Sequence, residues 1–196
     1  MFKKAIFLSV MVFCSFSVLS KMCFALQLLT QEDALKKVFG PQTQIVTETK
    51  DLAEPKLSKV KAILGGELVH YQKGSKSAGV AAKTSFDFYF ALKDSNKTAV
   101  ALIDEEPGKW GPVKFIVALD LQGVVKQVEV LSYEEKRGQP IARHSFLSQF
   151  EGKTSKSPLQ VEKDITGISG ATISSRCAAF AVKKAIALYG ELYLTQ

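Results

Sequence analysis

A run of small and hydroxylated residues at positions 167–175, GISGATISS, leads directly into a helix pattern with an apolar face. One helix needs only one capping side chain, so the run holds more hydroxyls than capping requires. The first turn of a helix leaves backbone N–H groups unpaired and carries about half a positive charge. Small residues allow a ligand close to those groups, so the run fits a phosphate-binding turn. Its members are Gly167, Ser169, Gly170, Ala171, Thr172, Ser174 and Ser175.

A heavily capped helix, packed tightly on a sheet through its small residues, explains the same run, and the spacing alone leaves both interpretations open. The run is not a P-loop, because no Gly-Lys-Ser/Thr follows the glycines. A threonine hydroxyl is a poor nucleophile without a base or metal to activate it. No histidine or carboxylate pair flanks Thr172. We therefore expect no self-catalysed chemistry and assign no catalytic residue.

Metal ligands are scarce in this sequence. Two of the three cysteines lie before residue 25, which leaves Cys177 alone in the remainder, and the two histidines, His70 and His144, stand in unrelated contexts. With no CxxC or CxxCH motif, we expect neither a metal site nor haem. Cys177 is expected as a small residue of the helix core. A catalytic Cys–His pair is the alternative.

The N-terminus has the layout of a secretory signal peptide. Lys3 and Lys4 precede an apolar run at positions 5–19, and a small-residue site ends at Ala25. We expect residues 1–25 to be removed and the mature domain to work outside the cytoplasm, in the periplasm or on the outer face of the membrane. An uncleaved membrane anchor is the alternative. The formal net charge of +7 includes three lysines of this segment, so +4 remains for the rest.

The remaining basic residues are interleaved with acidic ones, which is typical of a solvated surface, so we expect no nucleic-acid partner. No heptads are visible, and a monomer is expected. Periodicity and turn signals predict an α+β fold in which helices pack on an antiparallel sheet. The predicted helices span 30–40, 55–64, 142–150 and 171–189. The predicted strands span 85–92, 97–103, 113–120 and 124–131, with a Gln122-Gly123 turn joining the last two.

The strand at 85–92 alternates strictly, with Phe86, Phe88 and Phe90 on one face and Asp87, Tyr89 and Ala91 on the other. This pattern predicts a half-buried strand, whose phenylalanines belong to the core rather than to a cofactor pocket.

Ser169-Gly170-Ala171-Thr172, followed by Ile173-Ser174-Ser175, resembles the flavinylation motif of the FMN-binding domain family. That family includes the G subunit of the Rnf complex and the C subunit of the sodium-pumping NADH:quinone oxidoreductase. Other features resemble the family in the right order, over roughly residues 110–188. They are Trp110-Gly111-Pro112 before the hairpin, the segment 131–138 with Glu135 and Gly138, and FLSQFEGK at 146–153.

The resemblance implies FMN joined to Thr172 by a phosphoester bond, by a separate flavin transferase that uses FAD and Mg²⁺. It implies a flavin environment that includes Trp110, Glu135 and Gly138, although Trp110 fits a core position equally well. Where the family has Asp six residues before the acceptor, this chain has Thr166, with Asp164 two places earlier. Glu135 and Gly138 match the family's segment, whereas the intervening Lys136 and Arg137 do not.

The sequence therefore predicts residues 26–109 as the N-terminal part of one domain and 110–190 as its FMN-binding region. The expected function is electron transfer to or from a membrane or extracytoplasmic redox partner. A non-covalent FMN-binding or sensing module, and a structural domain that has lost the flavin, are the alternatives.

Overall fold

A computed structural model describes residues 26–134 and 139–195. A six-stranded antiparallel sheet has the strand order β1-β6-β5-β4-β3-β2. The strands are β1 (Leu26–Gln27), β2 (Gln44–Asp51), β3 (Ser85–Lys93), β4 (Asn96–Pro107), β5 (Pro112–Asp120) and β6 (Val125–Tyr133). The helices are α1 (Gln31–Phe39), α2 (Lys56–Leu64), α3 (His144–Leu147) and α4 (Thr172–Tyr189). Short 3₁₀ turns at Gln139–Ala142 and Ser148–Phe150 flank α3, and a π turn at Gly190–Leu194 follows α4. The predicted α+β class is confirmed.

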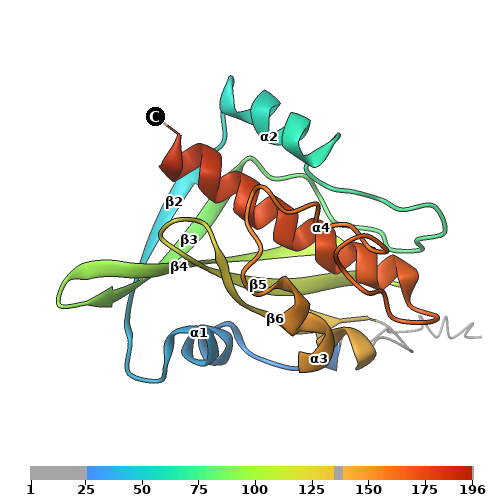
Figure 1. The fold of residues 1–196 in the computed structure, drawn as a ribbon, viewed down its shortest axis with the longest axis horizontal. Coiled ribbons are helices and arrows are strands. Elements are labelled where there is room, and N and C mark those ends of the chain that lie inside the picture. The colour runs from blue at the N-terminus through green and yellow to red at the C-terminus, as the bar shows by residue number, and fades with distance from the viewer. Residues whose placement is uncertain (1–25, 135–138, 196) are drawn as a thin grey trace, which may run out of the picture.

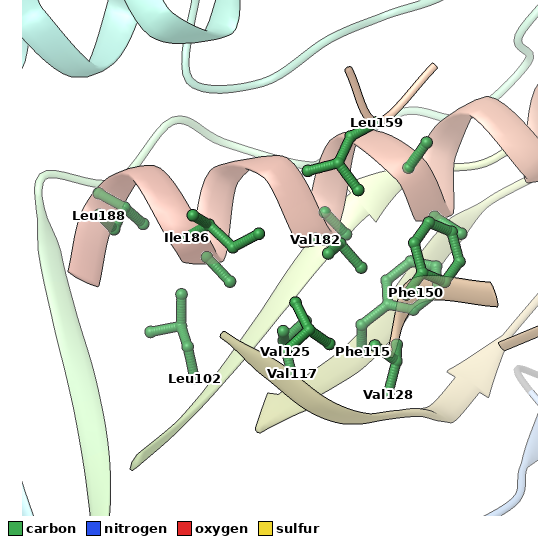
Figure 2. Close-up of a cluster of buried hydrophobic side chains, with 14 of the residues drawn as sticks. Leu102, Phe115, Val117, Val125, Val128, Phe150, Leu159, Val182, Ile186 and Leu188 are labelled. Atoms are coloured by element: carbon green, nitrogen blue, oxygen red, sulfur yellow. The ribbon is translucent and has the colours of Figure 1, made fainter. Parts of the chain in front are cut away.

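The long helix α4 crosses one face of the sheet, with α2 beside it, and α1 covers the opposite face (Figure 1). Alanines bring α4 close to the strands, and its larger side chains fill the space between them. Val182 and Ile186 of α4 lie above Phe115 and Val117 of β5 (Figure 2). Cys177 is buried in the same layer, as predicted for a core residue.

The β3 strand corrects one expectation, because both of its faces are covered along most of its length. Phe86, Phe88 and Phe90 lie in the main core, as predicted. Tyr89 and Ala91 are also buried, Tyr89 in a second cluster with Ala34 and Leu35 of α1, whereas Asp87 is exposed. Strict alternation predicted a solvated second face because it does not reveal that a helix packs there.

The helices predicted at 30–40, 55–64 and 171–189 are confirmed to within one residue at each end. Thr30 caps α1 by accepting the Asp33 N–H at 3.1 Å. The predicted hairpin turn is also confirmed, with Gly123 at φ +82°. The segment predicted as one helix at 142–150 is divided between α3 and a 3₁₀ turn.

The β2 strand is absent from the prediction, and β4 extends four residues beyond the predicted end at Ile103. Most of β2 is exposed at the sheet edge. Its sequence QIVTETKD therefore has no apolar face from which a strand could be predicted. β4 continues through Asp104 and Glu106, which are charged but buried. Within residues 26–134 and 139–195, no helix is long and apolar enough to cross a membrane.

Candidate functional site

The α4 helix begins at Thr172, and the residue in its N-cap position is Ala171, which has no side-chain acceptor. Within the described part of the chain, the N-cap position provides no side-chain hydrogen bond to the first turn. Gly170 makes the turn into α4 at φ +75°, a left-handed conformation that glycine adopts without strain. The first-turn N–H groups are therefore left without a side-chain cap. This favours a phosphate-binding turn over a heavily capped helix.

The four hydroxyls divide into an inner and an outer pair. Ser174 and Ser175 are buried. The Ser175 hydroxyl accepts the Ile168 N–H and donates to the Ala171 carbonyl, both at 3.0 Å, so it fastens the preceding turn to the helix. Ser169 and Thr172 are exposed and line an open cavity of about 550 Å³. Among the described residues, neither of these two hydroxyls has a hydrogen-bond partner.

The remaining wall of this cavity is the loop 161–168, which the FLSQFEGK segment holds in place. The Gln149 side chain accepts the Thr166 N–H at 2.8 Å and donates to the Thr166 carbonyl at 3.2 Å. The Lys153 ammonium lies 3.0 Å from the Asp164 carboxylate. That carboxylate also accepts the Gln160 N–H at 2.9 Å. The segment therefore positions the loop rather than facing the cavity with its own polar groups.

Asp164 makes contacts that hold this loop in place. Partial burial would raise the pKa of its carboxyl, but the Gln160 N–H and the Lys153 ammonium outweigh it and hold the pKa below its ordinary value. Gly167 allows the loop to pack against itself, because a Cβ there would lie 2.8 Å from Val161 Cγ1. Thr166 stands where the resemblance expects Asp. It is exposed and lines the cavity, and its backbone N–H donates to the Gln149 side chain.

A second loop, residues 72–76, joins the start of α4 to the turn before β5. The Gln72 side chain donates to the Ile173 carbonyl at 2.8 Å. Ser75 Oγ donates to the Gly108 carbonyl at 2.5 Å, and the Lys76 N–H donates to the Lys109 carbonyl at 2.6 Å. Four residues of extended chain span at most about 14 Å, so the turn at 108–111 lies near the first turn of α4.

Trp110 stands on that turn, and its side chain is 39% exposed, which rules out the core position. The Lys76 ammonium lies 4.6 Å from the centroid of the indole ring and the Lys109 ammonium 5.5 Å from it. The ring is therefore an accessible aromatic surface in a cationic environment. Glu134 packs against Gly111, and a Cβ on that glycine would clash with it at 2.5 Å. Glu135 and Gly138 lie outside the described residues.

Sequence reasoning missed the loop 72–76. Gly74 marks a turn in the sequence, but nothing local indicates that Gln72 and Lys76 reach two segments far along the chain. The buried Lys184 was missed as well, because in the helix pattern it stands beside the partly exposed Lys183. Within the described ranges, no group of three or more potential ligands is placed to hold a metal ion.

Residues 108–187 match the model of the FMN-binding domain family. A curated relative is the G subunit of the proton-translocating ferredoxin:NAD(+) oxidoreductase complex of Clostridium ljungdahlii, 29% identical over 107 residues. The match covers 51% of this chain and 58% of the relative, so the chain spans little more than half of the relative's length. Among solved structures, NqrC of Shewanella oneidensis matches with 14% identity and a TM-score of 0.48, over 82% of this chain and 84% of that one.

The residues at the start of α4 fit the phosphate end of a mononucleotide. The helix terminus has no side-chain cap, the Thr172 and Ser169 hydroxyls face an open cavity, and Gly170 has no atom within 4 Å of where its Cβ would stand. The resemblance to the family, inferred from the motif and its neighbours, is confirmed. Residues 108–187 therefore resemble an FMN-binding domain, and the cofactor that this match indicates is FMN.

Proposed function

We propose that this protein is an exported electron-transfer flavoprotein that carries FMN covalently on Thr172 through a phosphoester bond. The observation that carries this assignment is the contrast between the hydroxyls. Thr172 is exposed in the cavity at the helix start and has no hydrogen-bond partner among the described residues. Ser174 and Ser175 are buried. Ser169 faces the same cavity, but from the turn that precedes the helix.

In our proposal attachment requires a second protein, because a threonine hydroxyl is a poor nucleophile without activation and the described residues hold no group placed to bind a metal ion. The proposed partner is a flavin transferase that takes FAD as donor and Mg²⁺ as its own metal. The bond between Thr172 Oγ1 and the FMN phosphorus forms, and the pyrophosphate bond of FAD breaks. AMP leaves, and the hydroxyl proton is released to the transferase or to solvent. No oxidation or reduction accompanies this step.

The bound flavin supplies the electron transfer, and the protein supplies position and electrostatics. In our proposal, the first-turn N–H groups and the dipole of α4 stabilise the phosphate, with Ser169 as a further donor. Ser174 and Ser175 shape the turn from inside. Trp110 offers an exposed surface for the isoalloxazine ring, and Glu135 and Gly138, which lie outside the described residues, are further proposed flavin-binding residues. Lys76 and Lys109 give that surface a positive potential, which favours negative charge on the ring.

The proposed redox partner is a membrane or extracytoplasmic protein, and the proposed location is the outer side of the cytoplasmic membrane. The clostridial relative belongs to a proton-translocating oxidoreductase complex, which supports a partner of that kind. The signal-like N-terminus supports export. N-terminal sequencing of protein recovered from the cell envelope tests it. A chain that still begins at Met1 and resides in the cytosol would contradict export.

The test of the cofactor linkage is the intact mass and visible absorbance of protein co-expressed with a flavin transferase. We expect yellow protein with a mass gain equal to FMN less one water, and colour that survives denaturation. Colour released by denaturation would support the non-covalent module instead. Colourless protein of unmodified mass, made beside a control flavoprotein that the same cells do modify, would support a structural domain without flavin.

A further inference from the structure

A second cavity, of about 330 Å³, lies on the outer side of α4, away from the sheet. One wall is the end of α2 with the residues that follow it, Gly65 to His70, and the opposite wall is the segment 159–161. The outward side of α4 forms the floor. Among the described residues, Val161 alone borders both this cavity and the cavity at Thr172, so the two are neighbours with separate linings.

Two cations of α4, Arg176 and Lys183, line this cavity without a carboxylate partner among the described residues. The next residue along the helix, Lys184, points into the interior and is paired with Asp104 and Glu106. The cavity's carboxylate, Glu67, is bound by Lys61 at 2.7 Å, so it does not neutralise either cation. The cavity therefore has an uncompensated positive charge.

Apolar and aromatic groups lie between the two cations. Ala179 and Phe180 occupy the intervening turns of α4, and the imidazole of His70 stacks on the Phe180 ring with centroids 5.5 Å apart. Leu159 and Val161 close the far side. Arg176 and Lys183 are seven residues apart on one helix, which separates their Cα atoms by about 10.5 Å. Cations at both ends of an apolar floor are complementary to an apolar body that carries an anionic group at each end.

We propose that this cavity binds a small aromatic dianion, with one carboxylate-type group at Arg176, the other at Lys183 and the ring system over Phe180. An isolated exposed cation does not select a ligand. Here the two charges and the aromatic floor act together, so affinity requires both a flat apolar body and two anionic groups at the correct separation. The assignment rests on the cavity alone and does not depend on how FMN is attached.

The probe is naphthalene-2,6-dicarboxylate, titrated into ¹⁵N-labelled full-length protein while amide shifts are followed. We expect saturable shifts at Gly65, Gly66 and Ala179. Naphthalene-2-carboxylate should bind more weakly, and inorganic phosphate and 2-naphthalenemethanol more weakly still. Arg176→Gln and Lys183→Gln should each weaken binding by about tenfold, the effect of one charge-assisted hydrogen bond. Lys126→Gln, an exposed charge on β6 outside the cavity, should leave the affinity unchanged.

Several results would overturn the proposal. They are shifts that map outside the cavity, equal affinity for the neutral naphthalene, or retention of full affinity in both glutamine variants. The titration is repeated on protein loaded with FMN, and the affinity should persist. Loss of binding on loading would show that the flavin itself fills this cavity, and would refute a separate site while leaving the flavoprotein assignment intact.

Discussion

The two ends of α4 bring polar side chains into opposite surroundings. At its start, the Thr172 and Ser169 hydroxyls are exposed in an open cavity. About 18 Å further along the helix, Lys184 is 2% exposed and lies between two carboxylates of β4. Its ammonium is 2.5 Å from Asp104 Oδ2, contacts Glu106 Oε1, and donates to the Leu68 carbonyl at 3.2 Å. Lys83 adds a second cation, 2.5 Å from Asp104 Oδ1.

The hydroxyls at the start of α4 are open to a ligand, whereas the charged groups around Lys184 are paired with one another inside the fold. Burial alone would lower the pKa of Lys184, but Glu106 and Asp104 outweigh it and raise the pKa. Burial alone would raise the pKa of Asp104, and here Lys184 and Lys83 outweigh it and lower the pKa. The buried cluster is therefore an internally paired contact between α4, β4 and the loop after α2. Within the described residues, the Thr172 and Ser169 hydroxyls have no such internal partner.

The largest effect is expected from Lys184→Met, which removes the ammonium and leaves two carboxylates buried without their main partner. We expect the free energy of unfolding to fall by about 3–5 kcal/mol, measured by urea denaturation at neutral pH. Lys183→Met, one position away and partly exposed, is the matched control and should cost about 0.5 kcal/mol or less. Similar losses in the two variants would show that the buried cluster has no special structural role.

The next effect is a pH dependence from Glu106. Burial raises the pKa of its carboxyl from 4.5 to about 7, although Lys184 acts in the opposite direction. Between those values the folded state holds a proton that the unfolded state has released. Stability should therefore fall as pH rises from about 4.5 through 7, by on the order of 3 kcal/mol.

Urea unfolding of wild type and Glu106→Gln at pH 5, 6, 7 and 8 measures this term. Glutamine does not titrate, so the variant should lack the decline that wild type shows across this window. A wild-type stability that rises between pH 5 and 8, or an identical profile in the variant, would contradict the assignment of a raised pKa to Glu106.

A smaller effect is expected at the other end of α4. Ser175→Ala removes two hydrogen bonds and leaves the partly buried Ile168 N–H unsatisfied, so it should cost about 1–2 kcal/mol. Ser169→Ala, at an exposed hydroxyl in the same run, should cost about 0.5 kcal/mol or less. Thermal unfolding of both variants compares them. If Ser169→Ala were the more costly, the division into inner and outer hydroxyls would be incorrect.

The sequence predicted the elements that follow a simple period or a turn signal. The helix from 171 to 189, the β5–β6 hairpin and the phenylalanine side of β3 were all accessible from apolar spacing. The same reasoning failed where tertiary contacts decide. β2 is a polar edge strand, the second face of β3 is covered by α1, and Lys184 is a lysine in the core.

The candidate site divides in the same way. The motif around Thr172 was recognisable from residue types, and the FLSQFEGK segment from its resemblance to a family. The separation of four hydroxyls into a buried pair and an exposed pair depends on how the turn at Gly170 folds. The hydrogen bonds of the loop 72–76 reach Gly108, more than 30 residues away in sequence, and Ile173, about 100 residues away. No local pattern encodes such contacts.

The central claim, that the exposed hydroxyl of Thr172 carries the flavin, is tested most directly by peptide mapping. Wild type, Thr172→Ala, Thr172→Ser, Ser169→Ala and Ser174→Ala are each co-expressed with a flavin transferase, digested and mapped by mass spectrometry. We expect FMN on Thr172 in wild type, in Ser169→Ala and in Ser174→Ala, and little or none in Thr172→Ser. Thr172→Ala should carry no covalent flavin while losing about 1 kcal/mol of stability or less, because it does not cap α4. Flavin on Ser169, Ser174 or Ser175, or a Thr172→Ala protein that still gains the mass of FMN less one water, would contradict the claim.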